Sequence, residues 1–195
     1  MKLVYKGKFN GDVESLPHGE HMPEAVKFKE FDDPKKLDIV MNVVALVVTV
    51  SLIIVIHKFA YGKLIDINPL GFLLSLLTLF PHELLHAMCF KETVYLYTNL
   101  SQGMLFITGP EPMTKARFIF MSMLPNIVFG FIPFLLFFMF PNSITGVLGV
   151  MGATCIGMGA GDYYNVFNAI TQMPKGAKTY IYGFSSYWFI PKTEE

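Results

Sequence analysis

Residues 82–86 are His-Glu-Leu-Leu-His, an HExxH pattern. On a helix, positions i and i+4 share one face, so the imidazoles of His82 and His86 can reach the same metal ion. Glu83 lies about 100° further round the helix, where its carboxylate can address a metal-bound water instead of the metal. Zinc hydrolysis needs ligands that hold the ion and a separate carboxylate that moves a proton. The alternative is a hydrogen-bonded cluster of these side chains that fixes helix packing.

A catalytic zinc usually has three protein ligands and a water, so the motif lacks one ligand. Asp162 is the only acid besides Glu83 within the predicted membrane spans. Because a charged group in hydrocarbon costs several kcal/mol, an acid there is expected to be functional. We therefore predict zinc bound by His82, His86 and Asp162. Asp162 could instead serve helix packing or a proton relay, and iron or cobalt would accept the same donors.

Two amides lie near these residues in the predicted spans. Asn126 falls at the depth of His82 and Asp162, each about 12 Å from the cytoplasmic end of its span. Its side chain could hold a substrate carbonyl or stabilise an oxyanion, which would make it catalytic, or it could hydrogen-bond to a neighbouring helix. Asn165 could orient the Asp162 carboxylate, although a cap or a helix contact is favoured.

The composition indicates an integral membrane protein. Of 195 residues, 53% are hydrophobic and 15% are charged, against about 25% charged in soluble domains, and the mean hydropathy is +0.47. A net charge of +0 leaves no basic field for nucleic acid. Cys89 and Cys155 both lie in apolar stretches, which argues against a disulfide framework or a cysteine metal site.

The hydropathy pattern predicts an all-α membrane protein, a bundle of four transmembrane helices. The predicted spans are Ile39–Ala60, Asn68–Phe90, Phe118–Phe140 and Ser143–Ile170. The last span is rich in glycine, which favours close central packing and a bend near residues 157–161.

Outside the spans we expect a polar cytoplasmic segment over residues 1–38 and an aromatic tail at the lipid interface over residues 171–195, on either side of a transmembrane core over residues 39–170. Residues 1–9 alternate as a short strand would. A β-hairpin is expected between spans two and three, with strands over residues 94–97 and 104–108, and with Asn99, Ser101 and Gly103 in its turn.

Lysine and arginine counts set the expected orientation. Residues 1–38 carry seven lysines, and the loop after span two and the tail carry further basic residues. With an even number of spans, this bias places both termini in the cytoplasm, although Lys58 and Lys63 run against it.

With these residues the chain resembles the bacterial family of membrane-embedded zincin peptidases, small proteins related to the site-2 proteases. The resemblance rests on HExxH late in the second span, the strand pair after it, the Asp in a glycine-rich last span and the aromatic tail near Tyr187 and Trp188. It implies a zinc metalloendopeptidase of the bacterial cytoplasmic membrane, with Glu83 as general base, that cleaves peptide bonds in or beside the membrane.

The sequence departs from the site-2 pattern at two places. Gly161 precedes the acid and Tyr163 follows it, where those enzymes often have an Asp-Gly pair. Asn126 follows Pro125 instead of beginning an Asn-x-x-Pro signature. The expected partners are a membrane protein or peptide substrate, the lipid bilayer and an accessory protein that helps to select substrates. The alternative function is a non-catalytic membrane metal protein, a carrier, sensor or scaffold, that retains the HExxH ligands.

Overall fold

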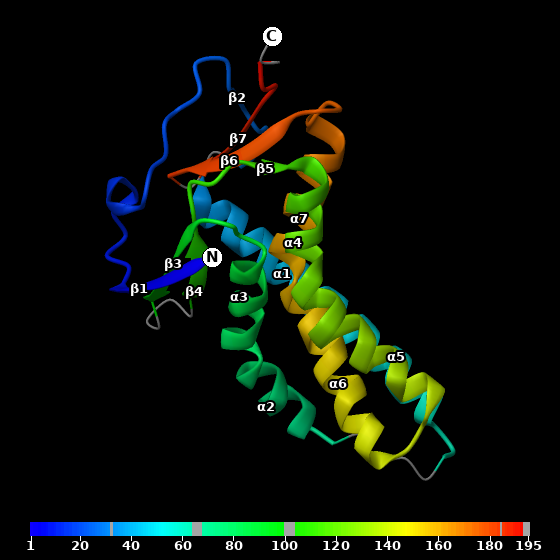
Figure 1. Ribbon diagram of the computed structural model, residues 1–195. Helices are drawn as coiled ribbons and strands as arrows, with labels where there is room; N and C mark the ends of the chain where they lie inside the picture. Colours follow the sequence, from blue (N-terminus) through cyan, green and yellow to red (C-terminus); the bar gives the residue numbers. More distant parts are fainter. Residues whose placement is uncertain (32, 64–67, 100–103, 184, 193–195) are drawn as a thin grey trace. The chain divides into compact units, whose positions relative to one another are not determined.

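The computed structural model describes residues 1–31, 33–63, 68–99, 104–183 and 185–192, and its packing divides the chain into two compact units (Figure 1). Unit 1 comprises Met1–Glu30, Glu83–Ser122 and Asn165–Glu195, and unit 2 comprises Phe31–His82 and Met123–Tyr164. Three helices pass from one unit into the other: α3 (Leu79–Met88), α4 (Lys115–Pro125) and α7 (Ala160–Gln172). The predicted division into residues 1–38, 39–170 and 171–195 describes which segments lie in the membrane. The two units do not test it, so it stays a prediction.

Among the described residues, five helical elements lie wholly within unit 2, and the first and last of them begin at a residue whose side chain caps the helix. They are α1 (Pro34–Ala60), α2 (Leu70–Leu77), the π-helical turn η3 (Asn126–Phe131), α5 (Ile132–Met139) and α6 (Ser143–Met158). Asp33 accepts a hydrogen bond from the Lys35 N–H at 3.0 Å at the start of α1. Asn142 forms a capping box with Thr145 at the start of α6. Such caps satisfy backbone donors that have no partner inside the helix.

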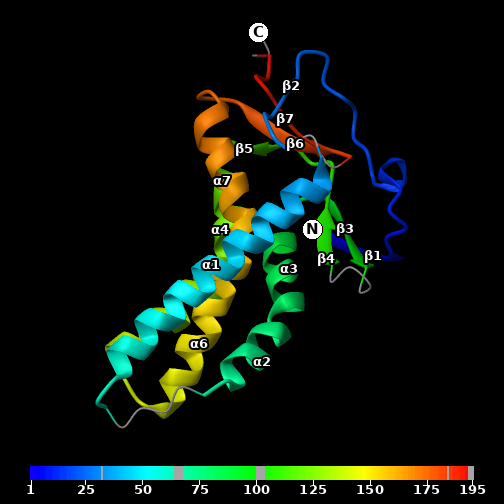
Figure 2. The same cartoon turned by 180° about the vertical axis from the view of Figure 1, so that it is seen from behind.

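Helix α6 is the central element of unit 2, because α1, α2, α5 and η3 all pack against it (Figures 1 and 2). Its glycines permit this close approach. A Cβ on Gly152 would lie 2.6 Å from the Gly130 carbonyl oxygen, and one on Gly149 would lie 2.9 Å from the Phe137 ring. The predicted central packing of the glycine-rich helix is therefore confirmed.

Within the described part of the chain, three helical stretches are long and apolar enough to cross a membrane, as expected of a membrane protein. They are Lys35–Ala60, Leu70–Met88 and Lys115–Met139. The predicted fourth span is a pair of helices, α6 and α7, bent by 50° at Gly159. The predicted bend is confirmed, but the bundle of four spans is not, because this pair counts as a fourth span only if both helices form one crossing.

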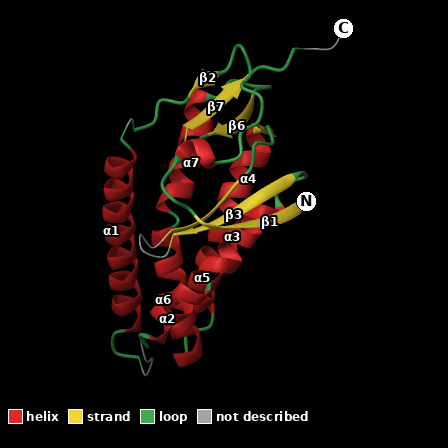
Figure 3. Ribbon diagram, turned by 90° about the vertical axis from the view of Figure 1, so that its left-hand side faces the viewer, coloured by secondary structure: helices red, strands yellow, loops and turns green. Residues whose placement is uncertain are grey.

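Unit 1 contains two small sheets (Figure 3). The first has the order β1-β3-β4 and consists of β1 (Lys2–Lys8), β3 (Thr93–Asn99) and β4 (Met104–Thr108). The second has the order β2-β7-β6-β5 and consists of β2 (Val26–Lys27), β5 (Met113–Thr114), β6 (Lys178–Tyr182) and β7 (Ser185–Phe189). A 3₁₀ turn, η1 (Val13–Ser15), lies between β1 and β2.

The expectation of an all-α fold was therefore wrong. The strand at the N-terminus and the hairpin β3–β4 are confirmed, but β1 pairs with β3 in parallel, a long-range pairing that local sequence does not encode. Two residues assigned to the hairpin turn, Ser101 and Gly103, lie outside the described residues. The aromatic tail forms the antiparallel pair β6–β7, and its position at the lipid interface stays a prediction.

An apolar cluster in unit 1 packs together the parts of α3, α4 and α7 that belong to this unit. Its buried members are Phe28, Ala87, Phe90, Val94, Met113, Phe118, Met121, Ala169, Met173 and Ala177. Burial of such side chains favours the folded state by about 25 cal/mol per Å² of apolar surface. The cluster therefore fixes the part of α3 that carries His86 against α4.

An ion pair also fixes the end of α3 to the start of α4. Arg117 Nη1 lies 2.6 Å from Glu111 Oε1, and Arg117 Nε donates to the Cys89 carbonyl at 2.8 Å. Glu111 Oε2 accepts from the backbone N–H groups of Lys91 and Glu92 at 2.7 and 2.9 Å. Burial alone would raise the pKa of Glu111, but the hydrogen bonds and charge of Arg117, with the two backbone N–H groups, lower it below its ordinary value.

We expect Glu111→Gln to lower the free energy of unfolding by on the order of 3 kcal/mol near neutral pH, because it leaves Arg117 without its buried partner. A carboxyl group whose pKa is lowered on folding stabilises the protein above its unfolded pKa, and this contribution disappears as the pH falls through the folded pKa. The difference from wild type should therefore shrink below pH 4.5. Thermal unfolding in detergent across this pH range measures the effect.

The matched control is Glu24→Gln, because Glu24 pairs with Lys192 at 3.7 Å and both side chains are more than three-quarters exposed. Its effect should stay below about 1 kcal/mol at every pH. An equal decrease of the free energy of unfolding in Glu111→Gln and Glu24→Gln would contradict the role given to Glu111.

Candidate metal centre

Helix α3 carries the whole HExxH motif on one uninterrupted stretch. The His82 N–H donates to the Thr78 carbonyl at 2.8 Å, so regular helical bonding is established before the motif begins. The predicted i, i+4 relation of His82 and His86 is therefore present. His82 and Glu83 are half-buried and His86 is buried.

His82 and Asp162 meet within unit 2. His82 Nε2 lies 3.2 Å from Asp162 Oδ2, and the two side chains are 18% and 16% exposed. Two ligands about 2.0 Å from a tetrahedral zinc ion stand about 3.3 Å apart, so this separation fits a shared metal. The ligand atoms of His82, His86 and Asp162 all lie within 4.8 Å of one another. These three residues therefore form a group that could hold a metal ion, and their role as zinc ligands stays a prediction.

His86 is held by the backbone of α4. Its Nδ1 lies 2.9 Å from the Met121 carbonyl oxygen, and both groups belong to unit 1. Because a carbonyl only accepts, Nδ1 carries the proton and Nε2 keeps its lone pair, the form in which an imidazole binds a metal. Met121 is an apolar residue that acts through its main chain, so sequence reasoning had no side-chain signal by which to find this contact.

Glu83 is held by strand β4. Its Oε2 accepts a hydrogen bond from the Ile107 N–H at 3.1 Å, again within unit 1. The carboxylate is therefore anchored by a backbone donor, and it is not a member of the group of ligand atoms formed by the two histidines and Asp162. The predicted role of Glu83 in proton transfer stays a prediction. The position of the hairpin after α3 was predicted, but its contact with Glu83 was not.

Asn126 lies at the first position of η3 and is completely buried. Its Nδ2 donates to Asp162 Oδ2 at 2.7 Å, and its Oδ1 accepts from the Tyr163 hydroxyl at 3.4 Å. The depth match with Asp162 that the sequence suggested therefore corresponds to a direct contact. Its predicted role toward a substrate carbonyl or oxyanion is untested, as is the predicted role of Asn165 toward Asp162.

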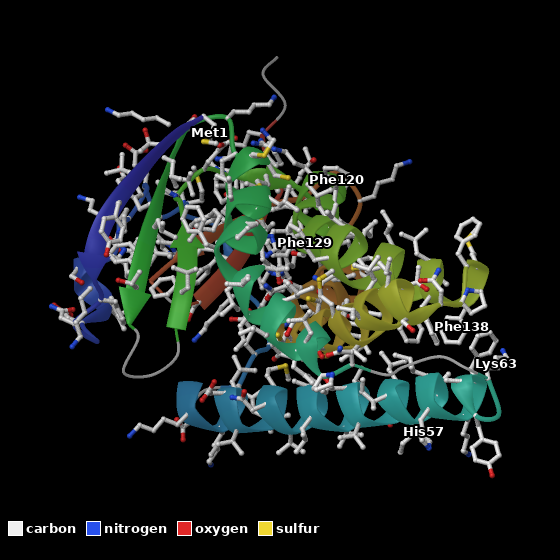
Figure 4. All side chains as sticks on the ribbon, turned by 90° about the horizontal axis from the view of Figure 1, so that it is seen from below. Met1, His57, Lys63, Phe120, Phe129 and Phe138 are labelled. Atoms are coloured by element: carbon white, nitrogen blue, oxygen red, sulfur yellow. The ribbon has the colours of Figure 1, made fainter. Side chains whose placement is uncertain are left out.

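His57 lies away from this group of residues. It is exposed near the end of α1, and its side chain points away from the other helices of unit 2 (Figure 4). Lys63, beyond the same helix, places its ammonium group 3.4 Å from the centre of the Phe59 ring. Neither residue belongs to the candidate metal centre.

The donor set fits zinc. Two imidazoles and one carboxylate leave a fourth position for water, as in catalytic zinc sites. The tautomer required of His86 is the one its hydrogen bond imposes. The three candidate ligands come from α3 and from the first turn of α7, directly after the bend at Gly159.

Comparison with known proteins gives one positive result. Residues 75–178, more than half of the chain, match the model of the family described as "Putative zincin peptidase". The chain belongs to this family, and this membership indicates a zinc metallopeptidase. The matched residues include the HExxH motif and Asp162. No curated protein and no solved structure gives a significant match.

We expect the purified wild-type protein and Glu83→Gln to hold about one zinc per chain, and His86→Ala and Asp162→Ala to lose it, because only the latter two remove ligand atoms. Elemental analysis of protein in detergent measures this directly, after dialysis against a weak chelator. His57→Ala is the matched control, since it removes an exposed imidazole outside the centre. Full zinc occupancy in His86→Ala would contradict the ligand assignment.

Proposed function

We propose that this protein is a zinc-dependent endopeptidase that hydrolyses peptide bonds of membrane-protein substrates within or beside the membrane. The observation that carries the proposal is the division of HExxH between two tasks. The histidines and Asp162 form one group of ligand atoms, and Glu83, between the two histidines in the chain, accepts a hydrogen bond from the backbone of β4. Family membership supports zinc peptidase chemistry, and the apolar helices support action at a membrane.

Zinc held by His82, His86 and Asp162 would acidify a water and polarise the carbonyl of the scissile bond. Glu83 accepts the proton of the attacking water, whose oxygen forms a bond to the carbonyl carbon. As the carbon–nitrogen bond breaks, Glu83 gives the proton to the leaving amine. The Ile107 N–H donates to one Glu83 oxygen and so helps to orient the carboxylate for this transfer.

Strand β4 is suited to hold the substrate, because it is the last strand in the order β1-β3-β4. Successive residues of a β-strand direct their backbone N–H and C=O groups to opposite sides of the strand. The Ile107 N–H faces Glu83 instead of β3, so Leu105, two residues earlier, also directs its backbone groups away from β3. A transmembrane helix satisfies its backbone internally and must unwind before it can be cleaved. Pairing with β4 would supply new partners to the extended segment beside the base.

The cellular setting belongs to the same proposal. The relation to site-2 proteases is supported by the HExxH motif and by an aspartate in a glycine-rich last span, and it favours a bacterial cytoplasmic membrane. The lysine and arginine bias favours both termini in the cytoplasm. The partners are the lipid bilayer, a membrane protein or peptide substrate, and an accessory protein that helps to select it; no nucleic acid is involved.

Glu83→Gln should abolish cleavage while zinc remains bound, because the amide cannot accept and return a proton. The measurement compares new N-termini in membranes from cells that produce wild type, Glu83→Gln or no protein. We expect peptide termini that occur only with wild type. If Glu83→Gln yields the same termini as wild type, the mechanism is wrong, and a non-catalytic carrier, sensor or scaffold becomes the better account.

Leu105→Pro tests the role of β4, since proline removes an outward N–H that the pairing with β3 does not use. We expect cleavage of substrates found in the preceding experiment to fall about tenfold, the equivalent of one lost hydrogen bond. Leu105→Ala, which keeps the N–H, is the control and should cleave near the wild-type rate. Equal rates in Leu105→Pro and Leu105→Ala, with zinc bound in both, would refute edge pairing.

A further inference from the structure

The amide of Asn126 is committed at both ends within unit 2. Its nitrogen donates to Asp162 Oδ2 at 2.7 Å, the same oxygen that lies 3.2 Å from His82 Nε2. Its oxygen accepts from Tyr163 at 3.4 Å, and the side chain is completely buried. The hydrogen bond that Asn126 Nδ2 donates is directed at the carboxylate of a proposed metal ligand, which is the contact that a positioning residue makes.

The backbone around Asn126 is built to bring this amide close to α7. Pro125 ends the regular helix α4, and the wide turn η3 begins at Asn126, with the Ile132 N–H bonded to the Ile127 carbonyl five residues earlier. Such π-turns are rare and occur frequently at functional sites. The turn is therefore a local departure from regular helix at the residue that contacts Asp162.

Space for the amide comes from the break between α6 and α7. Gly159 lies at that break, and a Cβ on it would overlap the Asn126 side-chain oxygen. Gly159 has an ordinary negative φ of −72°, so its lack of a side chain, and not a special backbone conformation, is what the site uses. The bend, the glycine and the π-turn all serve the same contact.

We propose that Asn126 is a positioning residue that holds the Asp162 carboxylate in the orientation that binds the metal, instead of a residue that binds substrate. This inference rests on the proposed zinc site and adds a role that the ligand set does not contain. A donor to a ligating carboxylate fixes its rotamer and spreads its charge, and loss of such partners typically lowers metal affinity 10- to 100-fold.

The test uses the full-length protein in detergent, with zinc affinity measured by chelator competition and with cobalt as a spectroscopic probe of ligand geometry. Asn126→Leu keeps the branched shape of the side chain and removes both polar atoms. We expect zinc to bind about 10- to 100-fold more weakly and the visible cobalt spectrum to change. Gly159→Ala, which pushes the amide away from its place, should act in the same direction, and it decides the question if Asn126→Leu fails to fold.

Asn168→Ala is the control for mere loss of a buried amide. Asn168 is also buried on α7, but its side chain bonds to Gln172. It should lower thermal stability while leaving zinc affinity and the cobalt spectrum unchanged.

Two results would overturn the inference. The first is wild-type zinc affinity with an unchanged cobalt spectrum in Asn126→Leu. The second is normal zinc binding in Asn126→Leu together with a raised KM for cleavage, which would indicate that Asn126 contacts the substrate. Asp162→Ala separates these failures from failure of the proposed function. If Asp162→Ala binds zinc as well as wild type, the ligand set itself is wrong; if it loses zinc while Asn126→Leu keeps it, only the positioning role is wrong.

Discussion

The Asp162 carboxylate is 16% exposed and stands in the first turn of α7, immediately after an apolar, glycine-rich helix. A charge in such surroundings must be paired or hydrogen-bonded, because its separation from water costs several kcal/mol or more. The chain meets this requirement with His82 from α3 and Asn126 from η3. Three segments distant in sequence are thereby required to meet at a single carboxylate, and the architecture of unit 2 is organised so that they can.

Small residues and backbone groups make that meeting possible. Glycines on α6 let α1, α5 and η3 approach it closely, and Gly159 both marks the bend into α7 and leaves space for Asn126. In unit 1 the remaining groups of the motif are fixed by main-chain atoms. The Met121 carbonyl sets the tautomer of His86, and the Ile107 N–H donates a hydrogen bond to Glu83. The chemistry-bearing side chains are thus oriented by neighbours whose own side chains are apolar.

Sequence reasoning succeeded where a residue type is rare in its setting. Histidines and acids inside apolar stretches identified His82, His86 and Asp162, and hydropathy located the helices that carry them. It failed where long-range pairing decides the outcome: the parallel match of β1 with β3 and the sheet formed by β2, β5, β6 and β7 replace an expected all-α fold. The β-branched and aromatic residues of Lys178–Tyr182, followed by Gly183 with a positive φ of 62°, were a usable signal for a strand and a turn. Contacts made by Met121 and Ile107 leave no trace in side-chain type.

X-ray absorption at the zinc edge, on the full-length protein purified in detergent, tests the central claim most directly because it identifies the ligand atoms themselves. The account predicts one zinc per chain with two imidazole nitrogens and oxygen ligands at about 2.0 to 2.2 Å, from His82, His86, Asp162 and water. A sulfur shell at about 2.3 Å, which would implicate Cys89 or Cys155, or a folded protein that takes up no zinc when zinc is supplied, would contradict it.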